Sequence, residues 1–263
     1  GAAFRCAGRP SGRDEGLPGR TPRSGLPLGV RRIAGGRDRV IKTPEDWMEW
    51  GVLGATIGRM AGSYWEVPVI EGIEAAPTSD QLKHCGAAMA SYGSTPLFHI
   101  VGITPECHAL ADVGGDTLSI TEIDENATAA LKQPFNGRGE AVDVVVFAAP
   151  QLSLVEMGQL ASLCGGRQRA DSTDVIVCTS SQVYSDAASM GYVSAIEAFG
   201  GRVLVGTCFY QQYAREIGEA NGWVRLLSNS AKIVNILGGY GYQPALAPME
   251  ACIASAEKGE IVT

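Results

Sequence analysis

The sequence predicts an α/β fold with mostly parallel sheets, and three observations in its second half carry that prediction. Val142–Phe147 is a nearly continuous run of apolar, mainly β-branched residues, which is typical of a strand covered by helices on both faces. Two further strand-like runs follow at regular intervals, over Asp174–Cys178 and Arg202–Gly206. Helical patterns that end at glycine pairs separate these runs, so strand and helix alternate as a parallel sheet requires.

The first half contains the same two kinds of element. Thr43-Pro44-Glu45-Asp46 predicts a helix start, because it combines a hydroxyl cap with proline and with acids at the positive end of the helix dipole. Gly51 and Gly54 in that helix indicate a place where another backbone packs closely. Strands are expected at Glu66–Ile70, Leu97–Ile103 and Thr117–Ile120, and further helices from Thr78 to Tyr92 and from near Asp124.

These patterns predict a basic leader at residues 1–40, a first α/β domain at 41–139 and a second α/β domain at 140–263. The leader holds nine arginines against three acids, a balance of +6, so the rest carries −13 within the overall −7. Its glycine, proline and arginine bias is typical of disordered or truncated sequence. The alternative is a basic arm that binds nucleic acid. The acidic remainder of the chain makes nucleic acid an unfavourable partner.

Composition and motifs exclude several classes of protein. No run of about 18 apolar residues occurs, so no membrane partner is predicted. Seven cysteines without a CxxC pair argue against disulfides and zinc, and indicate the reducing cytoplasm. The sequence has neither a P-loop nor a GxGxxG after a strand, which disfavours nucleotide-hydrolysing and nicotinamide enzymes.

Polar side chains at expected strand ends are the candidates for chemistry, because ligands of parallel sheets bind there. Thr104 and Glu106 follow one strand, in a Thr-Pro-Glu sequence equally typical of a helix entry. His99, within that strand, is either a core residue or a catalytic one. Cys208 follows another strand and is either a ligand for a metal or substrate, or a small buried hydrophobe.

A second candidate segment is Ser228-Asn229-Ser230-Ala231-Lys232, at an expected strand-to-helix turn. Two hydroxyls, an amide and a cation there would hold a carboxylate or phosphate, unless they only cap the helix. Ser180 lies in a comparable turn, Thr179-Ser180-Ser181. His84 and His108 have no partner at a metal-binding spacing and are expected on the surface.

Several segments, in order along the chain, resemble the aconitase X family of hydro-lyases. The family's elements of the form LKxxGAA, FHxVGxTPE, CPHxSxxE, DTC and TNSxK each have a counterpart here. Those counterparts are Leu82–Ala88, Phe98–Glu106, Pro150–Glu156, Thr207-Cys208 and Ser228–Lys232, with weaker similarity at Gly19–Leu26, Gly54–Gly72 and Glu250–Gly259.

The resemblance implies aconitase-like three-layer αβα domains with mostly parallel sheets. It also implies dehydration of a small hydroxy acid, such as cis-3-hydroxyproline or mevalonate 5-phosphate, with an iron or iron–sulfur Lewis acid. A small swivelling subunit or domain is the expected partner. The candidate residues are Thr104, Glu106 and Ser230 for catalysis, Ser228, Asn229, Lys232, Ser180 and His99 for substrate binding, and Cys208 for the metal.

Four positions depart from the family pattern. Ala149 and Gln151 stand in place of a cysteine or polar residue and a histidine, Gly206 replaces an aspartate, and Asn235 interrupts a histidine-containing run. These changes leave open a catalytically degenerate subunit or a module that binds a small anion.

Overall fold

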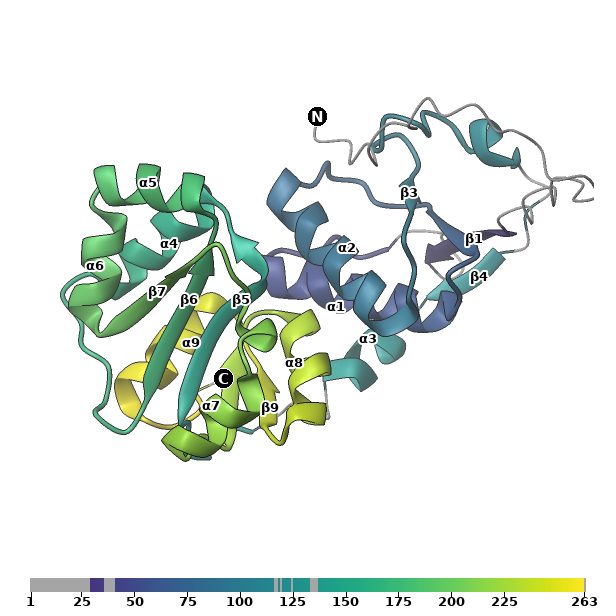
Figure 1. The fold of residues 1–263 in the computed structure, drawn as a ribbon. Helices are drawn as coiled ribbons and strands as arrows, with labels where there is room; N and C mark the ends of the chain where they lie inside the picture. Colours follow the sequence, from purple (N-terminus) through teal and green to yellow (C-terminus); the bar gives the residue numbers. More distant parts are fainter. Residues whose placement is uncertain are drawn as a thin grey trace, which may run out of the picture.

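The computed structural model describes residues 29–35, 41–115, 118, 120–123, 125–132 and 137–262, which form two sheets with interleaved helices (Figure 1). The first sheet has the strand order β3-β2-β1-β4 and the second β7-β6-β5-β8-β9. Every strand pair in both sheets is parallel, which confirms the predicted class. None of the helices in this part of the chain is long and apolar enough to cross a membrane.

The first sheet and its helices occupy the N-terminal half of the described residues. The strands are β1 (Gly29–Gly35), β2 (Glu66–Ile70), β3 (His99–Ile100) and β4 (Ile120–Ile123). The helices are α1 (Trp47–Ala61), α2 (Ser79–Gly93), α3 (Glu125–Lys132) and the 3-10 turn η1 (Leu110–Val113).

The second sheet and its helices follow. The strands are β5 (Val144–Leu152), β6 (Asp174–Thr179), β7 (Gly201–Val205), β8 (Arg225–Ser228) and β9 (Gln243–Leu246). The helices are α4 (Leu154–Cys164), α5 (Ser181–Ser189), α6 (Tyr192–Phe199), α7 (Ala214–Asn221), α8 (Ala231–Leu237) and α9 (Met249–Lys258), with 3-10 turns η4 (Phe209–Gln211) and η5 (Gly238–Tyr240).

Strand β1 corrects the expected basic leader, because it lies within residues 1–40. Arg31 forms an ion pair with Glu66 of β2, with Nε and Oε2 2.7 Å apart. Arg32 is buried and pairs with Glu71 at the same distance. Carboxylates on the neighbouring strand and directly after it therefore neutralise arginines whose composition suggests a solvated arm. Residues 1–28 lie outside the described part of the chain.

Strand β3 is shorter than the expected Leu97–Ile103. Only two residues pair with β2, and the chain turns at Gly102, whose φ of 75° is a conformation that favours glycine. The Thr104 side chain closes this turn: its hydroxyl accepts from the Ile100 N–H at 3.0 Å and lies 3.2 Å from the Ile100 carbonyl. Apolar residues that looked like a longer strand belong to a turn.

Helices α1 and α2 pack backbone to backbone. A Cβ atom added at Gly54 would lie 2.1 Å from the carbonyl oxygen of Cys85. One added at Gly93 would lie 2.0 Å from the carbonyl oxygen of Gly58. The close approach expected at Gly54 is thus confirmed, and it holds the two helices together as one block.

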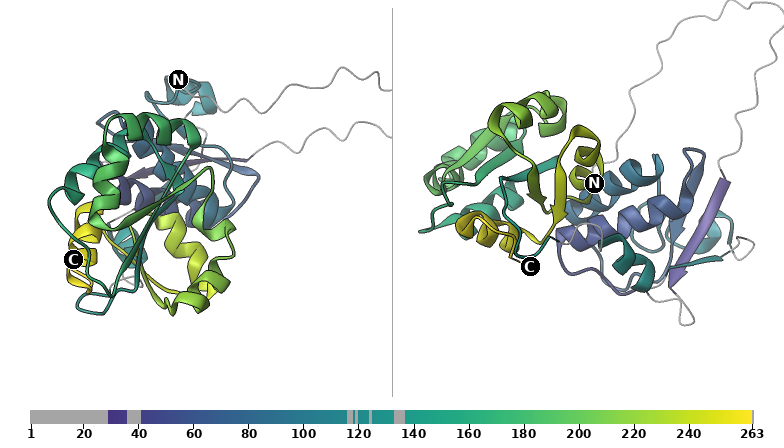
Figure 2. Two further views of the ribbon diagram at one scale, coloured as in Figure 1. Left: turned by 60° about the vertical axis from the view of Figure 1, so that its left-hand side comes forward. Right: turned by 90° about the horizontal axis from the view of Figure 1, so that it is seen from below.

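The α1–α2 block lies between the two sheets (Figures 1 and 2), with its apolar side on β1 and β2. The block also contacts α3, and it contacts α8 and β5 of the second sheet.

The second sheet has helices on both faces, as a three-layer arrangement requires. Side chains of β5 alternate between these faces. Val145 and Phe147 pack with α4, α6 and α9, whereas Val144 and Val146 pack with α7 and α8. A continuous β-branched run is therefore buried on both sides, as the sequence predicts.

Replacing Gly54 by alanine should lower the free energy of unfolding by about 2 kcal/mol or more, because the added methyl group would clash with fixed backbone atoms. Urea denaturation followed by circular dichroism measures this change. Gly238→Ala is the matched control, since no atom lies within 4 Å of a Cβ there. Equal stability of the two variants would contradict the close helix contact.

Candidate functional site

The second sheet places its candidate residues at a topological switch point. The chain runs outward from β5 through β6 to β7, then returns to the other side of β5 for β8 and β9. The connections after β5 and β8 therefore diverge to opposite sides, which opens a crevice at the carboxyl ends of these two strands. Ala149–Gln151 near the end of β5 and Ser228–Lys232 after β8 meet here.

Two serines of the Ser228–Lys232 segment join the two sides of the crevice. The Ser228 hydroxyl donates to the Val146 carbonyl at 2.6 Å and accepts from the Ser230 N–H at 3.1 Å. The Ser230 hydroxyl donates to the Ala149 carbonyl at 2.7 Å and caps α8 by accepting from the Ile233 N–H. Both side chains are buried, so these hydroxyls already satisfy backbone groups.

Cys208 and Lys232 lie on one side of this crevice. Burial raises the pKa of Cys208, while backbone N–H groups of Tyr210 and Ala149 and the charge of Lys232 partly offset the increase. Cys208 is half-buried, whereas the other cysteines among the described residues are buried. Lys232 is also half-buried and has no ion-pair partner in the described ranges.

The Ala149–Gln151 segment links the strand ends to one another. It contains a cis peptide bond between Ala149 and Pro150. The Gln151 side chain donates from Nε2 to the carbonyl oxygen of Thr207, 2.8 Å away. The glutamine that replaces the family's histidine thus holds the backbone beside Cys208.

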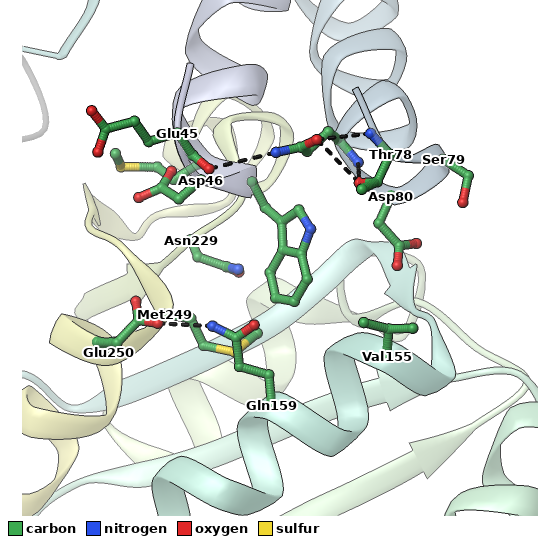
Figure 3. A pocket seen from close by; sticks show the side chains of 13 residues that line it. Glu45, Asp46, Thr78, Ser79, Asp80, Val155, Gln159, Asn229, Met249 and Glu250 are labelled. Carbon is green, nitrogen blue, oxygen red and sulfur yellow. Dashed lines mark hydrogen bonds between the residues drawn. The ribbon is translucent and has the colours of Figure 1, made fainter. Parts of the chain in front are cut away.

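The Asn229 side chain faces a different cavity, of about 350 Å³, which lies between the first turns of α1, α2, α4 and α9 (Figure 3). Asn229 is 3% exposed, and its amide has no hydrogen-bond partner among the described residues. Across the cavity, Gln159 donates from Nε2 to Glu250 Oε1 at 2.8 Å. The remaining lining residues are Glu45, Asp46, Trp47, Met48, Thr78, Ser79, Asp80, Gln81, Val155 and Met249.

The cavity is acidic because helix starts carry its carboxylates. Asp46 caps α1 by accepting from the Glu49 N–H at 2.7 Å, and burial raises its pKa. Asp80 and Glu250 lie in the first turns of α2 and α9. Acids at these positions complement the helix dipoles, so they indicate helix stabilisation rather than a particular ligand.

A buried ionic cluster crosses from α2 to α4 beside the crevice. Glu156 is 1% exposed, and its Oε1 lies 2.7 Å from Nε2 of His84. Its other carboxylate oxygen pairs with Lys83 and accepts from the Ser153 N–H at 2.7 Å. Ser153 also donates to Asp80 at 2.6 Å. The surface position expected for His84 is therefore wrong, since only 4% of it is exposed.

The sequence carries a local signal for part of this cluster. Ser153 and Glu156 have capping-box spacing, and the structure shows both reciprocal hydrogen bonds. Contact of the same carboxylate with His84 and Lys83 joins residues more than 70 positions apart. Local spacing does not show such a contact.

The remaining predicted site residues are His99, Thr104, Glu106 and Ser180. The Nδ1 atom of His99 is buried without a hydrogen-bond partner, and Glu106 is exposed beyond the turn that Thr104 closes. Ser180 caps α5 by accepting from the Val183 N–H at 3.2 Å. No hydrogen bond between described residues connects His99, Thr104 or Glu106 to the second sheet.

The described residues do not by themselves fit an iron–sulfur cluster, which is generally held by several cysteine thiolates. Cys178 is close enough to Cys208 for their charges to interact, but burial raises the pKa of Cys178 to about 12. In the described ranges, no group of three or more histidine, cysteine, aspartate or glutamate side chains is placed to hold a metal.

Comparison with known families accounts for this arrangement. The model of the aconitase X second domain matches residues 37–132, and that of the third domain matches residues 142–258. The chain belongs to the aconitase X family. The two matched segments correspond to the two sheets, apart from β1, which lies before residue 37.

Curated relatives of this aconitase X chain are dehydratases. Cis-3-hydroxy-L-proline dehydratase of Pseudomonas aeruginosa is 31% identical over 92% of this chain and 42% of the relative. The phosphomevalonate dehydratase large subunit of Methanothermobacter thermautotrophicus is 32% identical over 91% of this chain and 57% of the relative. The chain thus spans about two fifths to three fifths of the length of these relatives.

A solved structure supports the fold of this family member. The holo-form of aconitase X from Thermococcus kodakaraensis superimposes with a TM-score of 0.71 at 22% sequence identity. The superposition covers 87% of this chain and 55% of the other. The expected aconitase-like α/β architecture is confirmed.

Replacing Glu156 by glutamine should remove an acid-sensitive part of the stability. Although burial opposes it, hydrogen bonds and charges from His84 and Lys83 lower the pKa of Glu156 from its ordinary 4.5. The resulting stabilisation is complete above the unfolded-state pKa and is lost as the pH falls through the lower folded-state pKa. Glu156→Gln should therefore unfold more easily than the parent at neutral pH, and the gap should narrow in acid.

Urea denaturation at about pH 7 and about pH 3.5 measures that gap, since the second value lies below the unfolded-state pKa. Glu219→Gln, at an exposed glutamate of α7, is the control and should behave as the parent at both pH values. A gap of equal size at the two pH values would show that the Glu156 charge contributes nothing.

Proposed function

We propose that this chain forms the α/β core of a hydro-lyase that removes water from a small hydroxy acid. The observation that carries the proposal is the meeting of Cys208, Lys232 and the Ala149–Gln151 segment at the switch point of an aconitase X third domain. Two relatives with the same domains are named as dehydratases of hydroxylated acids. The substrate would be an acid of that class.

Lys232 would hold the substrate carboxylate. Its ammonium group has no carboxylate partner among the described residues and lies near Cys208. A cation in a partly dry crevice binds an anion more strongly than one in open solvent, because fewer waters compete. Ser228 and Ser230 would also fix the backbone against which the substrate lies.

Dehydration requires a base that takes the proton from the carbon beside the carboxylate, and an acid that gives a proton to the hydroxyl group on the next carbon, so that this group departs as water. A carbon–carbon double bond forms between the two carbons. Catalytic roles for Thr104, Glu106 and Ser230, and substrate contacts for Asn229, Ser180 and His99, stay predictions. The roles of Thr104, Glu106 and His99 require that the edge of the first sheet faces the substrate.

Cys208 would be one ligand of an iron or iron–sulfur centre, and the remaining ligands would come from outside the described residues. No step of the elimination given above depends on such a centre. The relatives named as large subunits support a small-subunit or small-domain partner for this chain.

A second candidate function is binding without turnover. Four departures from the family pattern favour it: Ala149, Gln151 and Gly206 replace polar or ligating residues, and Asn235 interrupts a histidine-containing run. The crevice would then hold a small anion through Lys232, without a complete set of catalytic groups.

Lys232→Met should lower kcat/KM for dehydration about 100-fold, because it removes the cation that orients the carboxylate. The assay combines the anaerobically purified chain with a small subunit of the phosphomevalonate dehydratase type. Cis-3-hydroxy-L-proline and phosphomevalonate are the substrates, and mass spectrometry detects the loss of water. Lys258→Met, at an exposed lysine on α9, should retain the parent activity.

Turnover that is equal in the parent and Lys232→Met would contradict the assigned role of Lys232. If neither substrate turns over but either binds in calorimetry, and binding is weakened by Lys232→Met, the second candidate function is supported instead.

A further inference from the structure

Lys83 connects helix α2 to the part of β5 that borders the crevice. Its ammonium group pairs with Glu156, lies 3.1 Å from Asp80 Oδ1 and donates to the carbonyl oxygen of Gln151 at 3.2 Å. Two of these contacts are hydrogen bonds and the one with Asp80 is an ion pair, so three acceptor groups surround the ammonium group. Lys83 therefore contacts the first domain, the start of α4 and the end of β5 at the same time.

Glu156 orients this ammonium group. Its two carboxylate oxygens face Lys83 and His84 separately, and the oxygen that faces Lys83 also accepts the Ser153 N–H. Residue His84 stacks on Trp47 of α1, with ring centroids 6.4 Å apart and planes inclined by 12°. Partners from both domains, the Lys83 and His84 side chains and the Ser153 N–H, thus orient the carboxylate.

Gln151 carries this constraint to Cys208. The Gln151 carbonyl oxygen receives Lys83, while its side-chain amide donates to the Thr207 carbonyl, one residue before Cys208. The backbone N–H of Ala149, on the same segment, partly offsets the rise that burial causes in the pKa of Cys208. A single residue, Gln151, therefore contacts both Lys83 and the backbone beside Cys208.

We propose that Lys83 and Glu156 are positioning residues: by holding the Ala149–Gln151 segment against α2, they keep Cys208 at its place in the crevice. The inference rests on the proposed function in taking Cys208 as part of the site. It adds that contact between the two domains determines the geometry of that site.

The test is alkylation of Cys208 by iodoacetamide in the full chain, with each modified cysteine identified by peptide mass spectrometry. Lys83→Met keeps an apolar stem of similar length and removes the two hydrogen bonds and the ion pair with Asp80. In Lys83→Met the rate of Cys208 alkylation should be about tenfold higher than in the parent, because loss of hydrogen bonds from a charged donor makes local opening more frequent. Buried Cys164 and Cys252 should keep their slow rates.

Lys132→Met is the matched control, since Lys132 is also half-buried and pairs with a carboxylate, Glu49, away from the crevice. Its Cys208 rate should equal that of the parent. Equal rates in Lys83→Met and the parent would overturn the proposal, as would a rise shared by all cysteines, which indicates general unfolding.

Labelling does not require turnover, so the two proposals fail separately. Faster labelling of Cys208 in Lys83→Met without any dehydratase activity would support positioning and reject the proposed function. Dehydratase activity in the parent, with the same Cys208 labelling rate in Lys83→Met and the parent, would support the proposed function and reject the positioning role of Lys83.

Discussion

The buried carboxylate of Glu156 is the constraint on which the arrangement of the two domains depends. A charged group away from water is costly by several kcal/mol unless partners replace its hydration. Glu156 obtains those partners from α2, through Lys83 and His84, and from its own helix start at Ser153. Separation of the two domains would remove both side-chain partners, so the ionic cluster favours the docked arrangement.

Much of the second domain could be predicted from sequence because its signals are local. The run Val142–Phe147 and the glycine-terminated helices locate strands and helices without knowledge of distant residues. The first domain was harder to predict. Read from sequence, Arg31 and Arg32 predict an exposed, solvated segment. Their ion pairs with Glu66 and Glu71 form only in the folded sheet.

Part of the candidate site could likewise be predicted from sequence, and part could not. Sequence order places Cys208 and the Ser228–Lys232 segment at strand ends, and parallel topology brings them to one crevice. It does not show that two serines there are used by backbone carbonyls, since those carbonyls belong to β5, about 80 residues earlier. The cluster around Glu156 is hidden for the same reason.

Strand β1 has a consequence for any shortened form of this protein. It lies between β2 and β4, and β4 pairs with no other strand in the described part of the chain. Proteolysis or cloning that removes the arginine-rich segment up to residue 40 would divide the first sheet. It would also leave Glu66 and Glu71 without the guanidinium groups that neutralise them. The segment that composition marks as expendable includes the central strand of a domain.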